Sequence, residues 1–475
     1  MEETKKLLAE SQVTPKANLG QSFCVDLELL RRLVDYSDVK ASDTVLEIGA
    51  GLGSLTILLA ERAETVLAVE LDPILAKMLR HTVADRENVR VIEGNILNLN
   101  HLVFQKVVAN PPYSISLPLL QALLRWKFTS AVMTLQREFA EKLTAKQGEE
   151  QYSQLSVLAS YRTDVEILER VPRSAFYPQP KVESVVVRIQ QRPPTFHIRD
   201  KELFTRLVKT LFTQRNRKVR NGLATFLQHN VGASKDEARK LLSGFPHLDR
   251  RVEKLAAGDF ADIANAAVGL VRGTKLTFEK LSLYIFPEVY RPSDDTFLLA
   301  KHLDVSAGEA ALDIGTGCGL LGILSAKRGA KVVAIDINPH AVRCAQLNAK
   351  LNDVADRFEA RQGNLFEKVG HREFDLIIFN PPYLPTEQND KAERWLEKAW
   401  QGGKTGREVI ERFMQALPRY LKPKGRMLMV LSSLSDPEKV VSALDAQGLD
   451  ATTLEEEPLE FERLIVLRAS CRNQV

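Results

Sequence analysis

Two stretches decide the fold of this chain: Val45-Leu-Glu-Ile-Gly-Ala-Gly-Leu-Gly53 and Ala311-Leu-Asp-Ile-Gly-Thr-Gly-Cys-Gly319. Each begins as a short apolar run and carries three glycines at alternate positions, which is typical of a buried strand that turns sharply into a helix. Because the two stretches match residue for residue in spacing, they indicate an internal repeat. A repeat with so long a period indicates duplicated or fused domains and not a solenoid.

The repeat extends well beyond the glycines. In both copies an acid precedes the glycines and a second acid follows 23 residues later, as Glu47 and Glu70 in the first copy and Asp313 and Asp336 in the second. Both copies then continue with a Gly-Asn pair and an Asn-Pro-Pro-Tyr tetrapeptide. These are Gly94-Asn95, Asn110–Tyr113, Gly363-Asn364 and Asn380–Tyr383. We therefore expect two domains of the same architecture.

Short apolar runs alternate with stretches of helical periodicity around both copies. We predict strands at residues 45–48, 66–70, 89–93, 311–314 and 331–336, and helices at residues 54–62, 73–83, 320–327 and 339–351. An alternating order of strands and helices produces a parallel sheet with helices on its faces. The prediction is an α/β fold with two Rossmann-type domains whose sheets are mostly parallel.

The region between the two copies has a different pattern. Residues 201–270 carry Leu and Phe at helical spacing without strand-like alternation, which predicts a small all-helical domain that begins after Pro193-Pro194. We expect domain boundaries at residues 1–192, 193–272 and 273–475. The stretch from Gly273 to Lys280 is interpreted either as a linker into the last domain or as the start of its first strand.

Composition narrows the class of protein. Hydrophobic residues make up 44% of the chain and charged residues 27%, as in ordinary globular proteins. No apolar run approaches the roughly 18 to 20 residues of a membrane helix, and Met1–Glu10 is charged, so we expect a cytoplasmic protein without a membrane partner. The four cysteines and eight histidines show no metal-ligand spacing, and we expect no metal. Residues 1–272 carry a net charge of +6 and residues 273–475 a net charge of −2, so only the first part favours nucleic acid.

The glycine-rich turns predict a cofactor site in each copy. Gly49, Gly51, Gly315 and Gly317 let the backbone approach a ligand without a Cβ in the way. Dinucleotide enzymes place a pyrophosphate at such a turn, so NAD is the competing interpretation. However, the acids Glu47 and Asp313 would repel a pyrophosphate, whereas they suit a ligand with a cationic amino-acid portion, such as S-adenosylmethionine.

Three further positions complete each predicted cofactor site. The acids Glu70 and Asp336, at the ends of the second strands, are expected to accept hydrogen bonds from two ribose hydroxyls. Asn95 and Asn364 stand where Asp is usual, and their amide oxygens are still able to accept a bond from the adenine amino group. The tetrapeptide asparagines Asn110 and Asn380 are the third position, and Leu365, which adjoins Asn364, is also predicted to contact the cofactor. The sequence therefore predicts two class I methyltransferase domains that use S-adenosylmethionine.

The tetrapeptides predict the reaction type. Each follows an apolar strand, at the edge of the sheet where open α/β folds bind substrates. Adenine N6 and a glutamine amide are planar –NH2 groups and poor nucleophiles. An Asn oxygen and the following backbone carbonyl are able to accept their two N–H bonds and align the nitrogen for transfer, while prolines stiffen the loop and the Tyr ring stacks on the planar group. We predict catalytic roles for Asn110, Pro111, Tyr113, Asn380, Pro381 and Tyr383; the alternative is a simple turn after a strand.

Residues 11–272 resemble the KsgA/Dim family of small-subunit rRNA adenine dimethyltransferases. Four motifs carry the resemblance: Asn18-Leu-Gly-Gln-Ser-Phe23, Gln136-Arg-Glu-Phe-Ala-Glu-Lys-Leu143, Ala175-Phe-Tyr-Pro-Gln-Pro-Lys-Val-Glu-Ser184 and Phe212-Thr-Gln-Arg-Asn-Arg-Lys-Val-Arg-Asn221. The resemblance implies that Gln21, Ser22 and Cys24 bind the cofactor, and that Phe176 and the tetrapeptide Tyr sandwich an adenine extruded from its stack. Erm-type ribosomal RNA methyltransferases share the core but fit the third motif less well.

Two details bear on the RNA substrate. The family's tetrapeptide usually has Leu or Ile where this chain has Pro111, so both single and double methylation of one nitrogen stay open. Lys201–Arg220 holds seven positive residues and one acid, Glu202, which suits a phosphate-contacting helix face. An alternative for the first half is a ribosome-assembly factor that docks on RNA without transferring methyl groups.

Residues 276–475 resemble the short archaeal–eukaryotic branch of the HemK/PrmC class. Pro287-Glu-Val-Tyr-Arg-Pro-Ser-Asp-Asp-Thr-Phe297 and Ala399-Trp-Gln-Gly-Gly-Lys-Thr-Gly-Arg-Glu-Val409 carry the resemblance. It implies a cofactor contact by Thr296 and methylation of the Gln in the Gly-Gly-Gln motif of a release factor. It also implies pairing with a small zinc-binding activator of the Trm112 type. DNA adenine methyltransferases share the tetrapeptide and form the alternative, although the net charge of −2 argues against nucleic acid.

Overall fold

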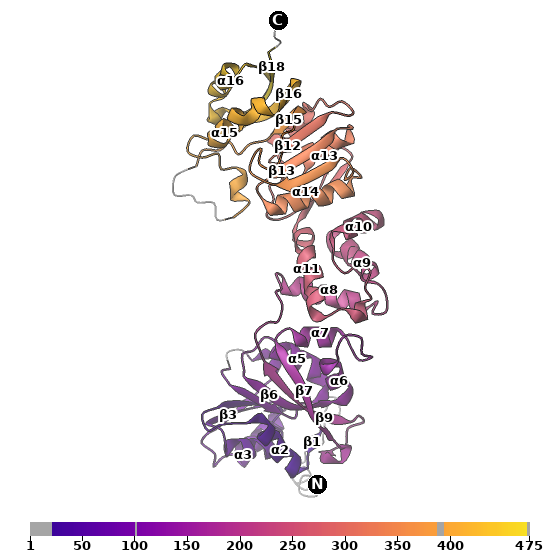
Figure 1. Ribbon diagram of the computed structural model, residues 1–475. Coiled ribbons are helices and arrows are strands. Elements are labelled where there is room, and N and C mark those ends of the chain that lie inside the picture. The colour runs from indigo at the N-terminus through magenta and orange to yellow at the C-terminus, as the bar shows by residue number, and fades with distance from the viewer. Residues whose placement is uncertain (1–20, 100–101, 387–393, 473–475) are drawn as a thin grey trace. The chain divides into compact units, whose positions relative to one another are not determined.

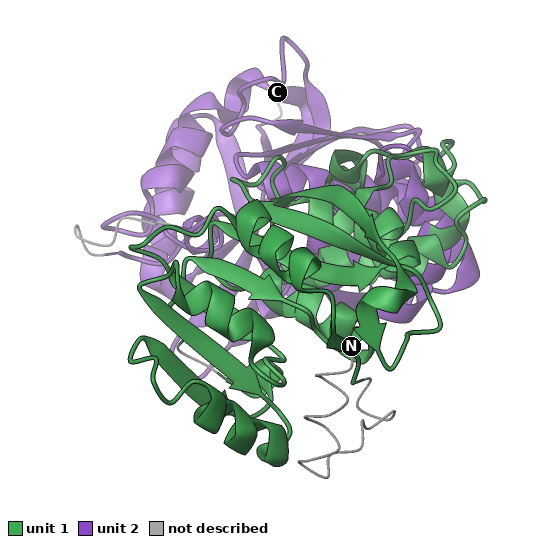
Figure 2. Ribbon diagram, turned by 90° about the horizontal axis from the view of Figure 1, so that it is seen from below, with its two compact units in different colours: residues 1–222, 249–264 green, residues 223–248, 265–475 purple. Residues whose placement is uncertain are grey.

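The computed structural model describes residues 21–99, 102–386 and 394–472 (Figure 1). The chain divides into two compact units, shown in different colours in Figure 2. Unit 1 comprises residues 1–222 and 249–264, and unit 2 comprises residues 223–248 and 265–475. Each unit contains one large sheet, and the two are described in turn.

Unit 1 is built on a seven-stranded sheet with the order β4-β3-β2-β5-β6-β9-β7. The strands are β2 Thr44–Ile48, β3 Thr65–Glu70, β4 Val89–Glu93, β5 Lys106–Ala109, β6 Ser130–Gln136, β7 Thr163–Val171 and β9 Ser184–Gln191. Strands β2 to β6 run parallel, whereas β9 is antiparallel to both of its neighbours. A separate two-stranded sheet joins β1 Phe23–Cys24 to β8 Phe176–Tyr177.

Helices cover both faces of this sheet because the parallel strands are apolar on both sides. Neighbouring residues of β2 show this directly, since Val45 packs into one hydrophobic cluster and Leu46 into the other, both with no exposed surface. Helices α2 Leu27–Ser37, α3 Ser54–Ala60 and α4 Pro73–Thr82 line the first cluster. Helices α5 Ser116–Leu123, α6 Arg137–Thr144 and α7 Gln154–Ser160 line the second.

Unit 2 repeats this topology, with the strand order β14-β13-β12-β15-β16-β18-β17. The strands are β12 Ala310–Ile314, β13 Lys331–Asp336, β14 Phe358–Gln362, β15 Phe374–Phe379, β16 Leu421–Ser432, β17 Leu449–Pro458 and β18 Arg463–Cys471. The flanking helices are α12 Asp294–Lys301, α13 Leu320–Lys327, α14 Pro339–Leu351, α15 Glu408–Ala416 and α16 Pro437–Ala446. The predicted fold class, with two mostly parallel Rossmann-type sheets, is confirmed.

The start of the second repeat corrects one of the two interpretations of residues 273–280. Strand β10 Thr274–Phe278 pairs with β11 Leu281–Ile285 as an antiparallel hairpin, so this stretch is not a linker and the strand interpretation is right. The turn between the strands places Glu279 at φ +50°, in the left-handed region. Alternating apolar residues before a two-residue turn are the ordinary signature of a hairpin.

The region between the sheets is helical, with α8 Lys201–Phe212, α9 Val219–Val231, α10 Lys235–Leu241 and α11 Ala257–Arg272. The boundary between units falls inside α9 and again inside α11. The expected boundaries at 1–192, 193–272 and 273–475 stay a prediction. Within the described part of the chain, helices long and apolar enough to cross a membrane do not occur.

Helices α10 and α11 supply part of unit 2. The Glu237 carboxylate accepts hydrogen bonds from Lys275 Nζ at 2.9 Å and from Ser282 Oγ at 2.8 Å. Burial alone would raise the pKa of Glu237, but the Lys275 ammonium and the hydroxyl and amide donors outweigh it and lower the pKa to about 2. Lys240 Nζ lies 2.6 Å from an oxygen of Asp353. The last domain is therefore fastened to helices that precede it in the chain.

A glycine in α11 tests this packing. A Cβ at Gly269 would lie 2.7 Å from the ring of Phe286, so Gly269→Ala is expected to destabilise the protein by about 1 to 3 kcal/mol. Elsewhere in a helix the same exchange stabilises by roughly 1 kcal/mol. Gly258→Ala in the same helix is the matched control, because its Cβ would meet its nearest neighbour at 4.0 Å. Thermal unfolding should show a lower midpoint for the first variant only; equal midpoints would contradict the packing.

Candidate active sites

A cavity of about 330 Å³ lies at the carboxyl ends of β2, β3 and β5 in unit 1. Its volume falls in the range of ligand sites, about 300 to 1,000 Å³. All first-half residues predicted for catalysis or cofactor binding line it: Gln21, Ser22, Cys24, Glu47, Gly49, Gly51, Glu70, Asn95, Asn110, Pro111, Tyr113 and Phe176. Asn18 to Gly20 of the N-terminal motif lie outside the described residues. The fold thus brings together residues that are up to 155 positions apart in the chain.

The glycine turn is required by the close approach of its neighbours. Gly51 has a φ of +57°, and a Cβ there would lie 3.3 Å from the ring of Phe23. Gly49 has a φ of +74°, and its Cβ would lie 3.4 Å from Pro112. A side chain at either position would be strained by its backbone angle and would press on the tetrapeptide or on β1.

Glu70 anchors this turn. Its Oε2 accepts a hydrogen bond from Gly51 N at 2.8 Å and its Oε1 accepts one from Asp72 N at 2.9 Å. The carboxylate is buried, and burial raises its pKa. Glu70 also lines the cavity, where a carboxylate suits the hydroxyl donors of a sugar.

Glu47 is a buried acid with one unpaired side-chain oxygen. The residue is 1% exposed, and its Oε2 is buried without a hydrogen-bond partner among the residues that the structure describes. Burial raises its pKa to about 8. Burying an unpaired carboxylate oxygen is costly. A ligand with an ammonium group would supply the missing partner, so this cavity fits such a ligand.

The tetrapeptide asparagine is held on both sides of its amide. Asn110 Nδ2 donates to the backbone carbonyl of Ser22 at 3.3 Å, and Asn110 Oδ1 accepts from the hydroxyl of Thr134. Tyr113 Oη and Ser184 Oγ form a hydrogen bond with each other. The sequence did not predict a role for the hydroxyls of Thr134 and Ser184, because contacts between neighbouring strands leave no signal in the local sequence.

The second cavity, of about 470 Å³, occupies the equivalent place in unit 2. Ten second-half residues were predicted for catalysis or cofactor binding. Nine of them line this cavity: Thr296, Gly315, Gly317, Asp336, Asn364, Leu365, Asn380, Pro381 and Tyr383. Asp336 repeats the contacts of Glu70, since its Oδ2 accepts from Gly317 N at 2.8 Å and its Oδ1 accepts from Asn338 N at 2.9 Å.

Asp313 is the residue that does not line this cavity, and its predicted contact with the cofactor stays a prediction. Its Oδ2 accepts hydrogen bonds from Thr316 Oγ1 at 2.6 Å and from Gly322 N at 3.0 Å, so the carboxylate faces the first turn of α13 and does not line the cavity. Aspartate is one methylene shorter than the glutamate at the matching position of the first copy, and Thr316 and the helix supply donors close by. Burial raises its pKa to about 7.

Asp295 organises the second site. This buried carboxylate accepts hydrogen bonds from Thr296 N at 2.6 Å, from Asn380 Nδ2 at 3.1 Å and from Tyr383 Oη at 3.2 Å. Tyr290 Oη lies 3.4 Å from it. The sequence motif includes Thr296, but it gives no sign of the role of Asp295, because the tetrapeptide partners Asn380 and Tyr383 are more than 80 residues away.

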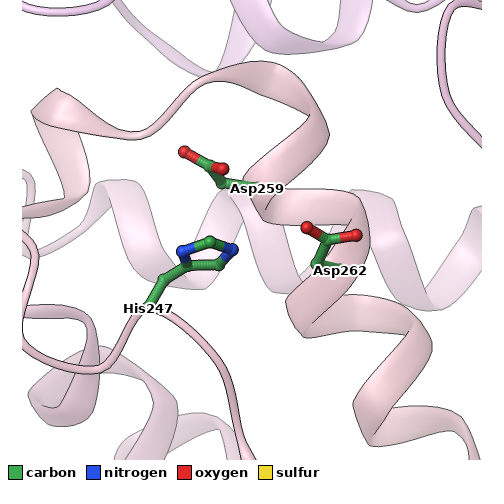
Figure 3. A group of neighbouring side chains, drawn as sticks. All are labelled: His247, Asp259 and Asp262. Carbon is green, nitrogen blue, oxygen red and sulfur yellow. The ribbon is translucent and has the colours of Figure 1, made fainter.

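One group of metal-ligand residue types occurs elsewhere. Figure 3 labels these side chains, which are His247, Asp259 and Asp262. Asp262 is exposed and the other two are partly buried. Acidic groups of this kind are common without a metal, so we assign none to them.

Comparison with known proteins separates the two halves. Residues 13–267 match the family described as ribosomal RNA adenine dimethylase, and residues 292–448 match the methyltransferase small domain. Both halves are therefore methyltransferase domains, and the resemblance of the first half to rRNA adenine dimethyltransferases is confirmed.

Similar proteins cover the first half of the chain. The probable ribosomal RNA small subunit methyltransferase A of Methanosarcina acetivorans is 39% identical over 247 residues, 52% of this chain and 91% of that protein. Its counterpart from Thermococcus kodakarensis is 40% identical over 252 residues, 52% of this chain and 88% of that protein. A solved dimethyladenosine transferase from Plasmodium falciparum is 25% identical, with a TM-score of 0.45, and covers 51% of this chain and 95% of that one. By its match over residues 13–267 and by these relatives, the chain belongs to the ribosomal RNA adenine dimethylase family.

Proposed function

We propose that the first half transfers methyl groups from S-adenosylmethionine to N6 of adenosines in small-subunit rRNA, twice on the same nitrogen. The observation that carries this proposal is the position of Asn110 and Tyr113 on the wall of a cavity that also holds Glu47 and Glu70. The names of the curated relatives support the small subunit as the substrate.

The residues of the site suit an –NH2 nucleophile. S-adenosylmethionine supplies an electrophilic methyl group on a sulfonium. Asn110 Oδ1 and the backbone carbonyl after it accept the two N–H bonds of adenine N6, which turns the nitrogen lone pair toward the methyl group. Tyr113 and Phe176 stack on the extruded base. A general base is unnecessary, because the nitrogen becomes acidic once it is methylated and loses its proton to water.

Exposed basic residues in α8, at the start of α9 and in the turn between them support an RNA substrate. Six of the seven positive residues between 201 and 220 are exposed: Lys201, Arg206, Lys209, Arg217, Lys218 and Arg220. Lys218 and Arg220 form ion pairs with the same carboxylate, Asp249, at 3.2 and 2.5 Å. One acid therefore pairs with two cations. Basic side chains that contact phosphates position an RNA without reading its sequence. The alternative is a ribosome-assembly factor that docks on RNA without methyl transfer. Such a factor would use the same basic residues.

For the second half we propose a HemK/PrmC-type reaction, N5-methylation of the glutamine in a release-factor Gly-Gly-Gln motif. The Asn380 amide and the carboxylate of Asp295 suit a planar amide substrate, and the net charge of −2 over residues 273–475 favours a protein over a nucleic acid. A small zinc-binding activator of the Trm112 type is proposed as a partner. DNA adenine N6-methylation is the alternative, because adenine presents the same –NH2 group to the same tetrapeptide.

The two sites should fail independently. Asn110→Ala is expected to lower methyl transfer to small ribosomal subunits by about 100-fold or more, because the nitrogen is no longer aligned, and to leave the second activity unchanged. Asn380→Ala should do the reverse. Transfer of labelled methyl groups to purified small subunits, release factor and DNA measures both. Loss of both activities from one substitution would refute the two-site model, and label on DNA alone would favour the alternative for the second half.

Glu47 predicts a pH dependence of cofactor binding. Its pKa is raised to about 8, so below that pH the free site holds the neutral acid, whereas a cationic ligand favours the carboxylate. Affinity for S-adenosylmethionine should therefore rise from about pH 6 to about pH 8 and then level off, with release of a proton on binding.

Calorimetry on a chain whose second site is silenced by Asp336→Ala measures this dependence. Glu47→Gln is the matched control, because it keeps the shape of the side chain and cannot ionise; only the titration of the ligand itself should remain. Equal pH slopes in the two proteins would show that Glu47 does not face the cofactor.

A further inference from the structure

A threonine hydroxyl lies buried against the first tetrapeptide. Thr134 stands on β6 and has no exposed surface. Ala109 pairs with Met133 across the parallel strands β5 and β6, so Asn110 and Thr134 are the next two residues in register. Their side chains meet at the carboxyl end of the sheet, where the Thr134 hydroxyl donates to Asn110 Oδ1.

The backbone of Ser22 decides which end of the amide faces the threonine. Its carbonyl is able only to accept, so the Asn110 –NH2 group must point toward it, as the 3.3 Å hydrogen bond shows. Oδ1 is then turned to Thr134, whose hydroxyl acts as the donor. One lone pair of Oδ1 is used in this way, and the other is left for an N–H of the substrate.

A hydroxyl at this place is unusual for the surroundings. Val186, directly opposite on β9, and Val132, on the same face of β6, are both fully buried and apolar. A valine at 134 would fill nearly the same volume, and a buried hydroxyl costs free energy unless it is hydrogen bonded. The bond to Asn110 is what offsets this cost.

The second half shows the contrasting solution. Phe379 pairs with Met429 across β15 and β16, so the residue in register with Asn380 is Val430, which is fully buried. There the amide is held at its nitrogen by Asp295 and Thr296, both at 3.1 Å. A hydroxyl that donates to the amide oxygen is thus found at the first site, whereas at the second site the Thr296 hydroxyl accepts from the amide nitrogen.

We propose that Thr134 is a positioning residue for the first methyl transfer site: its hydroxyl presets the Asn110 amide so that Oδ1 meets the substrate nitrogen without a rotation first. This inference rests on the proposed function of the first half. Thr134 is not among the residues that line the cavity, so it acts through Asn110.

Thr134→Val removes the hydroxyl and keeps the shape, whereas Thr134→Ser keeps the hydroxyl. In the full-length chain, with purified small ribosomal subunits and labelled S-adenosylmethionine, we expect Thr134→Val to lower kcat about tenfold. The KM for subunits and the Kd for cofactor should stay unchanged, because binding groups are intact. Thr134→Ser should restore kcat to within about threefold of the unaltered chain.

Thr163→Val is the matched control, because Thr163 is also buried and its hydroxyl donates only to the backbone carbonyl of Ala159, on another element. It should leave kcat unchanged. The inference is overturned if Thr134→Val keeps full kcat, or if Thr134→Ser falls as far as Thr134→Val. A merely structural role would instead lower the unfolding midpoint and kcat and raise the KM for subunits and the Kd for cofactor.

The outcome for the unaltered chain separates this inference from the function on which it rests. If that chain transfers label to the subunits and Asn110→Ala does not, the proposed function stands, and the Thr134 variants alone decide. If the unaltered chain transfers none, the proposed function fails, and the positioning role fails with it.

Discussion

In both halves, a carboxylate at the end of one strand binds the glycine turn at the end of its neighbour. Glu70 and Asp336 each accept a backbone N–H from the turn at 2.8 Å and another from two residues further along their own chain segment. Each acid thereby ties two strand ends and the start of a helix to one point. The cavities form around this point, because the glycines carry no side chain to fill it.

The two tetrapeptides have identical sequences but different supports. Asn110 is held by a threonine hydroxyl and a backbone carbonyl, whereas Asn380 is held through its nitrogen by the buried carboxylate of Asp295. In both arrangements the amide oxygen is left with a lone pair for an –NH2 group. Different neighbours are compatible with one chemistry because alignment requires only that the amide be fixed, and any matching donor or acceptor is able to do this.

Local sequence was sufficient for the architecture and for most of the cavity lining. The apolar runs, the glycine turns and the 23-residue interval to an acid predicted both sheets, because strand and helix periodicity and left-handed glycine positions are properties of neighbouring residues. Strand β13 and helices α13 and α14 were predicted to the residue. The carboxyl ends of parallel strands meet at one edge, so residues at those ends were expected to share a site.

Contacts between distant segments were decided only by the tertiary structure. The sequence predicted Asn110, Asn380 and Thr296, but Thr134 and Asp295 emerged only when the sheet brought them beside the tetrapeptides. The bonds of Asp313 to Thr316 and to the start of α13 were likewise not predicted from the sequence. The physical reason is the same in each case: a polar side chain takes the partner that lies within hydrogen-bond distance, and that distance depends on strand register and helix placement, which neighbours in sequence do not specify.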